Sequence, residues 1–488
     1  MKLQEGIDDL KKKKLCYGCV SEDYLKDEIR VSGKAGKCSY CGTLTKSYTI
    51  ATMAERIATV FDEHYTRTSD QPDSFQQMML SDRESSYEWD RDGEPVVYAI
   101  MNAAQIPEQA AQDIQEILED ENGDYDAAMS GEETEFASDS YYEEKGSSIE
   151  AWHQEWNAFE RSLKTEARFF SQAAASHLAS VFRDIATMRT KSSRSLVVDA
   201  GPGTALSAIY RARAFQSEAK LVEAMCRPDM HLGSPPAHLS NAGRMNARGI
   251  SVFYGAGAAQ VAIAEVRPPV GSQALVGRFE IIRPLRLLDL TALSDVAERG
   301  SIFDPSLAQR MERAMFLRYL SGKMTRPIMP DDEPFDYLPT QAIADFLATQ
   351  KEPAIDGILF PSVQAAGNDL NVVLFHKAAR VENYHVPDGM KIEGRTYEEH
   401  ADGADIDYSV TEWVPPEENA KADPPRSGWP DFGGRIVDPW IDPDPDSRAP
   451  TLRVDMKSLT VHQVDKVSFD TTEFDVSRNR YQQRDTDF

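Results

Sequence analysis

Four cysteines near the start of the chain constrain its fold more than any other feature. They form two Cys-x2-Cys pairs, Cys16 with Cys19 and Cys38 with Cys41, separated by eighteen residues. Two such pairs can place four thiolates around one Zn²⁺ ion, and this spacing lies within the known zinc-site patterns. The other interpretation is two independent redox pairs. Because all four positions are thiols and none is left open, the pattern favours a structural zinc site.

Composition and charge narrow the class of protein. The 488-residue chain is 41% hydrophobic and carries a net charge of −27. This length exceeds one ordinary core, so two or three domains are expected. The negative charge disfavours general nucleic-acid binding, because it repels phosphate backbones. With no apolar run long enough to cross a membrane and no signal-peptide core at the start, we expect a cytoplasmic protein.

The first part of the chain changes from cysteine-rich to helical. Residues 1–50 are predicted to form a zinc ribbon with short strands near 28–31 and 46–50. Residues 51–190 are predicted to be helical, since apolar residues recur every three or four positions in MAERIATVFDEHY and IEAWHQEWNAFERSL. The run TEARFFSQAAASHLASVFRDIATM predicts one further long helix.

An acidic segment lies inside this helical region. Between Glu108 and Glu144 there are fourteen acidic residues and no Lys or Arg. It begins as the predicted helix AAQDIQEILED and continues as a predicted loop. One interpretation is a solvated acidic surface, and the other is a docking face for a basic partner or a mimic of nucleic acid.

The second part of the chain has a different pattern. From about residue 195 short β-type runs alternate with small turns, in ISVFY, ALVGRFEII, LRLLDL, AIDGILFPS and LNVVLFH. They predict a mixed domain over residues 198–384, which makes the chain a multidomain α+β protein. Residues 385–488 form an acidic, Pro-rich extension that can bury little apolar surface. Alternation in TLRVDMKSLTVHQVDKVSF predicts one or two late strands.

Two glycine-rich runs suggest nucleotide-binding folds. VVDAGPGTALSAI resembles the turn of a methyltransferase that binds S-adenosylmethionine, and VFYGAGAAQVAIAE resembles a Rossmann fingerprint. The second run has Gln260 where the closing Gly or Ala belongs, and Pro268 and Pro269 stop its helix. Neither run continues into repeated βαβ units, so both signals are weak.

A different answer comes from the order of several short motifs. They are Ile209-Tyr210-Arg211-Ala212-Arg213, Gly243-Arg244-Met245-Asn246 with Gly249, Phe253-Tyr254, Ala264-Glu265-Val266, DGILFPS over 356–362 and NVVLF over 371–375. In this order they resemble the RES family, named for its Arg, Glu and Ser, over about residues 205–381. Members are toxins of toxin–antitoxin pairs and related stand-alone proteins. The ribbon and helical region are similar to the HEPN-type extension ahead of RES domains in longer members.

The resemblance implies a fold related to ADP-ribosyltransferases that binds NAD⁺ and cleaves its nicotinamide–ribose bond. Arg211, Glu265 and Ser362 match the Arg, Glu and Ser of the family. Tyr254 matches the Tyr after the second strand, and Arg244 matches the Arg of a GRWN-like motif. In that motif this chain has Met where Trp is common, which leaves every chemical group of the site in place.

The residue types suit this chemistry. Guanidinium groups clamp a diphosphate with paired hydrogen bonds, and Arg211, Arg244 and Arg213 are the candidates. A carboxylate stabilises the positive charge that develops on the ribose when nicotinamide leaves, and Glu265 is the candidate.

Three further residues have supporting roles under the same interpretation. Tyr254 would stack on nicotinamide, Ser362 would orient the ribose or the carboxamide, and Asn246 would fix the loop that carries Arg244. Ordinary structural roles stay open: Tyr254 as a core residue, Ser362 as a turn residue, and Glu265 as an ion pair.

Three functions follow from this reading. The leading hypothesis is an NAD⁺ glycohydrolase or phosphorylase that acts as a growth-arresting effector. The alternatives are a mono-ADP-ribosyltransferase that modifies a protein, and a sensor that binds NAD⁺ or ADP-ribose without turnover. A toxin needs restraint, and an antitoxin or regulatory protein that blocks the pocket is the expected partner. The alternative is that the acidic loop and the Pro-rich tail of this chain block the pocket in cis.

Overall fold

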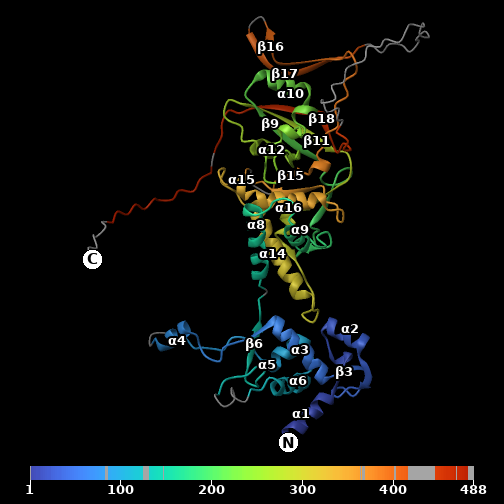
Figure 1. The fold of residues 1–488 in the computed structure, drawn as a ribbon, viewed down its shortest axis with the longest axis vertical. Coiled ribbons are helices and arrows are strands. Elements are labelled where there is room, and N and C mark those ends of the chain that lie inside the picture. The colour runs from blue at the N-terminus through green and yellow to red at the C-terminus, as the bar shows by residue number, and fades with distance from the viewer. Residues whose placement is uncertain are drawn as a thin grey trace, which may run out of the picture. The chain divides into compact units, whose positions relative to one another are not determined.

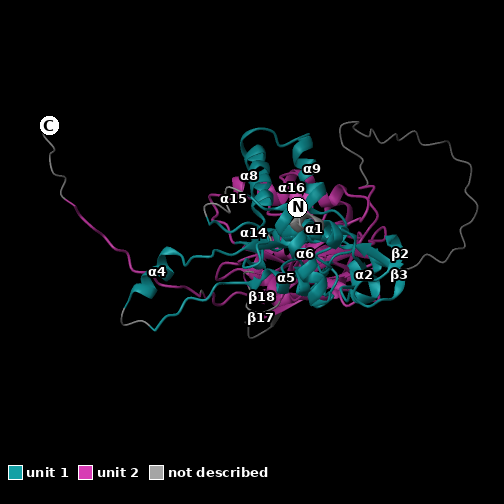
Figure 2. Ribbon diagram, turned by 90° about the horizontal axis from the view of Figure 1, so that it is seen from below, with its two compact units in different colours: residues 1–196, 292–326 teal, residues 197–291, 327–488 magenta. Residues whose placement is uncertain are grey.

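The structure is a computed structural model of the 488-residue chain. It describes residues 2–82, 86–124, 131–146, 148–362, 364, 369–400, 403–415, 446–468 and 470–481. The chain divides into two compact units, which Figure 2 colours separately: residues 1–196 with 292–326, and residues 197–291 with 327–488. The multidomain α+β expectation is therefore confirmed.

The first unit begins with a small antiparallel sheet of order β1–β3–β2. Its strands are β1 (Lys14–Cys16), β2 (Lys34–Lys37) and β3 (Leu44–Thr49). A strand predicted near 46–50 is thus present, but the one predicted near 28–31 is wrong. Those residues belong to helix α2 (Asp23–Ser32), because the Glu22 carboxylate caps its first turn and Leu25 and Ile29 bury one face.

The ribbon and the following helices share one core. The helices are α1 (Lys2–Lys12), α3 (Ile50–His64), α5 (Val96–Ala104) and α6 (Glu108–Glu121). Leu15 of the ribbon belongs to the same buried cluster as Ile114 of α6. Buried Asp113 accepts hydrogen bonds from Lys13 Nζ at 2.7 Å and from the Tyr40 hydroxyl at 2.6 Å. The ribbon is therefore bonded to the helices as well as packed on them.

A second group of helices in this unit surrounds an aromatic cluster. It comprises α8 (Glu150–Thr165), α9 (Gln172–Val181) and α14 (Leu307–Thr325). Trp152 and Trp156 of α8 lie 5.3 and 6.0 Å from Phe316 of α14, measured between ring centroids. The long helix predicted for this region is wrong, because the Ser171 side chain caps Ala174 N–H and starts α9 there.

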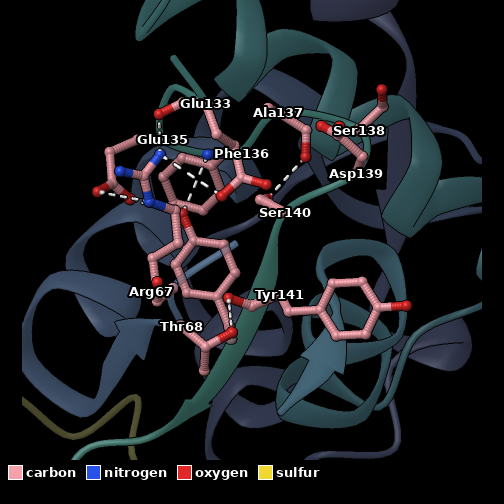
Figure 3. A network of polar contacts seen from close by, with 12 residues as sticks. Arg67, Thr68, Glu133, Glu135, Phe136, Ala137, Ser138, Asp139, Ser140 and Tyr141 are labelled. Carbon is pink, nitrogen blue, oxygen red and sulfur yellow. Dashed lines mark hydrogen bonds and ion pairs between the residues drawn. The ribbon is translucent and has the colours of Figure 1, made fainter. Parts of the chain in front are cut away.

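Part of the acidic segment folds onto two arginines. Both terminal nitrogens of Arg91 donate to the Glu133 carboxylate at 2.7 Å. Arg67 donates to the Glu133 carbonyl (Figure 3). Glu135 lies 3.7 Å from Arg67 Nε. The Glu133 side chain is only 10% exposed, so its charge is paired inside the unit. Residues 125–130 of the acidic segment lie outside the described residues.

Short elements complete the first unit. They are η1 (Tyr17–Cys19), β4 (Tyr65–Arg67), α4 (Ser74–Ser81), β5 (Glu94–Pro95), β6 (Tyr141–Glu144), β7 (Arg189–Thr190) and β13 (Val296–Ala297). Strands β4, β6 and β5 form a three-stranded antiparallel sheet, and β13 pairs with β7.

The second unit is built on one eight-stranded sheet of order β18–β11–β9–β10–β15–β14–β12–β8. The strands are β8 (Val197–Ala200), β9 (Ala208–Phe215), β10 (Phe253–Ala256), β11 (Gln273–Ile281), β12 (Leu285–Asp289), β14 (Gly357–Pro361), β15 (Leu370–Leu374) and β18 (Leu452–Gln463). All five predicted β-type runs are present. Strand β10 is antiparallel to both of its neighbours, unlike a strand of a Rossmann βαβ unit.

Helices and a hairpin complete the second unit (Figure 1). They are α10 (Glu218–Cys226), α11 (Pro228–His231), η2 (Ala237–Leu239), α12 (Ala259–Glu265), α15 (Glu333–Asp336), α16 (Leu338–Thr349), η3 (His376–Ala378), β16 (Lys391–His400) and β17 (Gly403–Trp413); α13 (Leu290–Leu293) spans the boundary of the two units. The hairpin packs on α10, and α12 packs on β9 and β11.

The last strand of the sheet comes from the C-terminal extension. Strand β18 pairs antiparallel with β11 from Gln273 opposite Gln463 to Ile281 opposite Leu452. Leu452 is fully buried in the same cluster as Phe279 of β11. The prediction of a late strand is confirmed, whereas residues 416–445 of the Pro-rich stretch lie outside the described residues.

Candidate active site

A carboxylate centre lies where α12 meets the ends of β14 and β15. Glu265 is the last residue of α12, Ser362 follows β14, and Asn371 is the second residue of β15. The Ser362 hydroxyl and the Asn371 amide both donate to Glu265 Oε1 at 2.7 Å. Among the described residues both hydrogen bonds of this carboxylate thus fall on one oxygen, and Oε2 stays available to a ligand.

The turn before α12 depends on a close approach of two strands. A Cβ on Gly255 would lie 3.1 Å from the Tyr210 carbonyl oxygen of β9, so a larger residue would push β10 away from β9. The Gly257 N–H donates to the Leu370 carbonyl at 2.8 Å, next to Asn371. These contacts start α12 at the sheet and direct its last residue toward β15.

Two arginines extend from one face of β9. Side chains alternate along a strand, and Ile209 and Phe215 belong to one core cluster whereas Ala212 belongs to the other. Arg211 and Arg213 therefore lie on the face of Ile209 and Phe215. Helix α12, which carries the carboxylate, packs against the cluster of Ala212.

Arg211 is a cation without a carboxylate partner in the described part of the chain. Its guanidinium lies over the Phe253 ring at 4.7 Å, and Nη1 is buried without a hydrogen-bond partner among the described residues. Burial, and then the charge of Arg213, lower the pKa of Arg211 to about 10, while Tyr254 acts in the opposite direction. A half-buried cation of this kind is suited to binding an anion.

A cleft of about 730 Å³ opens beside this arginine pair. Its polar lining consists of Arg211, Arg213, Lys220, Glu223 and His231. Val266, the residue after Glu265, also lines it, so the cleft reaches the end of α12. The lining contains one acidic side chain against two arginines and one lysine, which favours an anionic ligand.

A hydrogen-bonded loop holds Arg244. The Tyr254 hydroxyl accepts from Met245 N–H at 3.1 Å and donates to Asn246 Oδ1 at 3.0 Å. Asn246 is buried, and its amide donates to three carbonyls of the same loop. The Arg244 guanidinium lies over the Tyr337 ring at 5.3 Å. Burial raises the pKa of Tyr254 to about 12, so its hydroxyl stays protonated at neutral pH.

The start of α16 supports the same loop from the other side. Thr340 donates to the Arg244 carbonyl at 2.6 Å, and Gln341 donates to the Gly243 carbonyl at 2.8 Å. A Cβ on Gly243 would lie 2.8 Å from the Tyr254 hydroxyl, so this position requires glycine. The loop is therefore positioned by tertiary contacts on two sides.

The four cysteines of the first unit form a candidate metal centre. Their sulfur atoms all lie within 4.8 Å of one another. Cys16 Sγ is 3.7 Å from Cys19 and 3.6 Å from Cys41, and Cys19 is 3.8 Å from Cys38. Thiolates at about 2.3 Å from one tetrahedral zinc lie about 3.8 Å apart, so the sulfur spacing fits a four-thiolate metal site.

The structure brings some of the residues predicted for the site into contact and keeps others apart. Glu265 bonds Ser362, Arg211 and Arg213 share the cleft, and Arg244, Asn246 and Tyr254 share the loop. Sequence reasoning gave no role to Asn371, Lys220 or His231. Asn371 lay in a quoted motif, but its contact with Glu265 depends on strand register, which no local pattern reveals.

Comparison with known families decides the class of the second unit. The RES domain family matches residues 209–394, which include all of the candidate site residues of this unit. The chain is a RES-domain protein. HEPN/RES N-terminal domain 1 matches residues 31–177. In the sequence, the RES domain therefore follows the N-terminal domain that the resemblance implied. The chain matches no curated protein and no solved structure.

The RES domain gives the function in outline. RES domains are generally associated with enzymatic activity on NAD⁺, which supports an NAD⁺-related toxin or effector role for this RES-domain protein. In the described part of the chain, no helix combines the length and apolarity needed to cross a membrane.

Proposed function

We propose that this RES-domain protein is an effector that cleaves the nicotinamide–ribose bond of NAD⁺ and so depletes NAD⁺. The observation that carries the proposal is the fixed carboxylate of Glu265, held through Oε1 by Ser362 while Oε2 is available. A cation-lined cleft reaches the residue after it. Together they match the two needs of the reaction, which are a carboxylate for the ribose and cations for the diphosphate.

Glu265 acts on the charge that develops during bond cleavage. The bond between ribose C1′ and the pyridinium nitrogen breaks, and its electron pair moves to the ring, so nicotinamide leaves as a neutral molecule. The ribose gains positive charge, which a carboxylate fixed in advance stabilises without reorganisation. Water or phosphate then bonds to C1′ and loses a proton, for which the same carboxylate is the candidate base.

The arginines bind the other half of the substrate. Arg211 and Arg213 are proposed to contact the diphosphate, because they face the cleft together and Arg211 Nη1 has no partner in the described residues. Arg244 is proposed as a second contact from its own loop. The Tyr254 hydroxyl is already engaged by Met245 and Asn246, so its proposed contact with nicotinamide is through the ring face alone.

The four cysteines are proposed to hold Zn²⁺. Cys16, Cys19, Cys38 and Cys41 supply four sulfurs with the spacing of a closed site. Such an ion crosslinks the ribbon and supplies no open position for catalysis. Its proposed role is to stabilise the core that the ribbon shares with α6.

Three acceptors of the ADP-ribose group are compatible with the proposal. Water, phosphate and a protein side chain all attack the same carbon, and they give ADP-ribose, its 1″-phosphate or a modified protein. An antitoxin or regulatory protein that restrains the enzyme is the proposed partner.

One experiment tests the proposal. Purified protein is incubated with NAD⁺ with and without phosphate, and the products are identified by mass. Release of free nicotinamide by the wild type and not by Glu265→Gln supports the proposal, and the second product names the acceptor. Transfer of label from NAD⁺ to a lysate protein without free ADP-ribose would instead support a transferase. Binding of NAD⁺ with no turnover in any of these assays would support a sensor.

A further inference from the structure

Asn371 makes a contact that is difficult to explain by stability alone. Its amide nitrogen donates to Glu265 Oε1 at 2.7 Å, across 106 positions of sequence. Its amide oxygen is buried and has no hydrogen-bond partner among the described residues. A buried acceptor without a partner destabilises a fold, and an apolar side chain of the same shape would avoid that loss.

The orientation of this amide is fixed by charge. Rotating the amide by 180° would place its oxygen against the Glu265 carboxylate, where two acceptors repel each other. The nitrogen must therefore face Glu265, and the oxygen is left without a partner in the described residues as a consequence. Asn371 thus contacts Glu265 even though this orientation leaves its own amide oxygen without a hydrogen-bond partner among the described residues.

The backbone that carries Asn371 is held on both sides. It pairs with Ala256 of β10 and with Phe360 of β14, inside the eight-stranded sheet. The residue is only 4% exposed. The amide is therefore supported by a rigid element, as required of a group that must hold another group in place.

Ser362 and Asn371 are unequal donors to the same oxygen. A hydroxyl has one proton and can turn toward a ligand, and turning would break its bond to Glu265. The Asn371 amide is enclosed and cannot turn without repulsion. If Ser362 engages the substrate, Asn371 is the group that still holds the carboxylate.

We propose that Asn371 is the positioning residue of the site, which holds Glu265 in its working orientation when substrate engages Ser362. This inference rests on the proposed function, because it assigns the working carboxylate to Glu265. It predicts that Asn371 contributes to turnover and not to the stability of the fold.

The test compares two buried variants of β15 in the full chain. Asn371→Leu removes the donor and keeps a similar shape, whereas Val372→Ala removes apolar contacts at a fully buried neighbour. For Asn371→Leu we expect kcat for NAD⁺ to fall roughly 10- to 100-fold, KM to stay within about threefold, and the melting temperature to equal or exceed that of the wild type. For Val372→Ala we expect a lower melting temperature and nearly unchanged kcat below it.

A double variant and crystal structures complete the test. In a Ser362→Ala background, Asn371→Leu should lower kcat by about the same factor as it does alone, because Ser362 is engaged by substrate and does not hold Oε1 in the working complex. Crystal structures of Ser362→Ala with and without Asn371→Leu should show a displaced Glu265 carboxylate only where Asn371 is replaced.

The outcomes separate this inference from the proposed function. An Asn371→Leu protein with wild-type kcat, one that loses activity only together with thermal stability, or an unmoved Glu265 carboxylate would overturn the positioning role. A wild type that releases no nicotinamide would remove the proposed function, and the two crystal structures would still decide whether Asn371 holds Glu265.

Discussion

The Ser362 hydroxyl donates to Oε1 of Glu265 at 2.7 Å, although 97 positions separate the two residues. One residue ends a helix that packs on β9, and the other follows a strand three positions along the sheet. Their contact exists only when the central strands are in register. The Glu265–Ser362 contact therefore requires that strands β9, β10, β15 and β14 be correctly paired.

Replacing the carboxylate should abolish turnover and preserve the fold. Glu265→Gln keeps the oxygen that accepts from Ser362 but removes the negative charge, so we expect nicotinamide release to fall by about 100-fold or more. Chromatography of the products measures it. Glu393→Gln, on exposed β16, is the matched control and should behave as the wild type. Unchanged release from Glu265→Gln would assign the chemistry to another group.

Binding of an anion to Arg211 should weaken at alkaline pH. The folded pKa of about 10 lies below the ordinary value, so the guanidinium loses its proton at a lower pH than an exposed arginine. Affinity for ADP-ribose should be fully present below this pH and decline as pH rises through about 10. Calorimetric titration over this range measures it, and Arg211→Met should bind weakly at every pH.

The lowered pKa of Arg211 affects the stability of the fold in the opposite direction from ligand affinity: stability should increase as pH rises through about 10. The folded state disfavours the charged form, so the charge of Arg211 opposes folding below about pH 10, and this penalty is relieved at higher pH. Arg211→Met should therefore melt at or above the wild-type temperature at neutral pH. A clearly lower melting temperature would mean that the cation is paired inside the protein.

Removing one thiol should release the metal and destabilise the first unit. Cys38 is buried in the four-sulfur cluster, so Cys38→Ser should lower bound zinc from about one ion per chain to almost none. Because the ribbon shares a core with α6, helical signal should be lost at a lower temperature. Elemental analysis and circular dichroism measure both, and Cys226→Ser, outside the cluster, should change neither.

The Tyr254 hydroxyl should contribute to loop order more than to chemistry. Tyr254→Phe removes the acceptor of Met245 N–H and the donor to Asn246, which should lower the free energy of unfolding by about 1–3 kcal/mol. KM for NAD⁺ should rise as the Arg244 loop loosens, with a smaller change in kcat. Urea unfolding and initial rates measure these effects, and Tyr481→Phe, at an exposed position, serves as the control.

Two C-terminal truncations, one that keeps β18 and one that removes it, should differ in stability. Deleting 464–488 leaves the pairing of β18 with β11 intact and should give a folded protein. Deleting 446–488 removes a strand that buries Leu452 and exposes the edge of β11, so this protein should aggregate or melt at a lower temperature. Light scattering and thermal melts compare the two. Equal stability would mean that β18 adds little to the sheet.

The local pattern of apolar residues predicted those helices and strands whose buried positions recur regularly along the sequence. The apolar runs of β11, β12, β14 and β15 read as strands because both of their sides are buried. The pattern failed at α2, where Ile29 and Val31 read as strand residues while an i,i+4 pair and a capping carboxylate made a helix. It failed again between α8 and α9, where a serine cap breaks a continuous helical pattern.

The site was predictable only where a motif carried it. Glu265 and Ser362 came from the ordered motifs, and their contact needed the fold. Asn371, Lys220 and His231 gave no local signal, because each matters through a neighbour distant in sequence. Spacing predicted the four-cysteine cluster, since metal ligands constrain the chain directly.

The chain passes between its two units three times, after residues 196, 291 and 326. Helix α14 belongs to the first unit although it lies inside the sequence matched by the RES domain. A protease that cuts one crossing therefore leaves the two units joined at the other two crossings, as long as residues 1–196 and 292–326 stay packed as one unit. Release of the second unit from an intact first unit would need cuts at all three crossings.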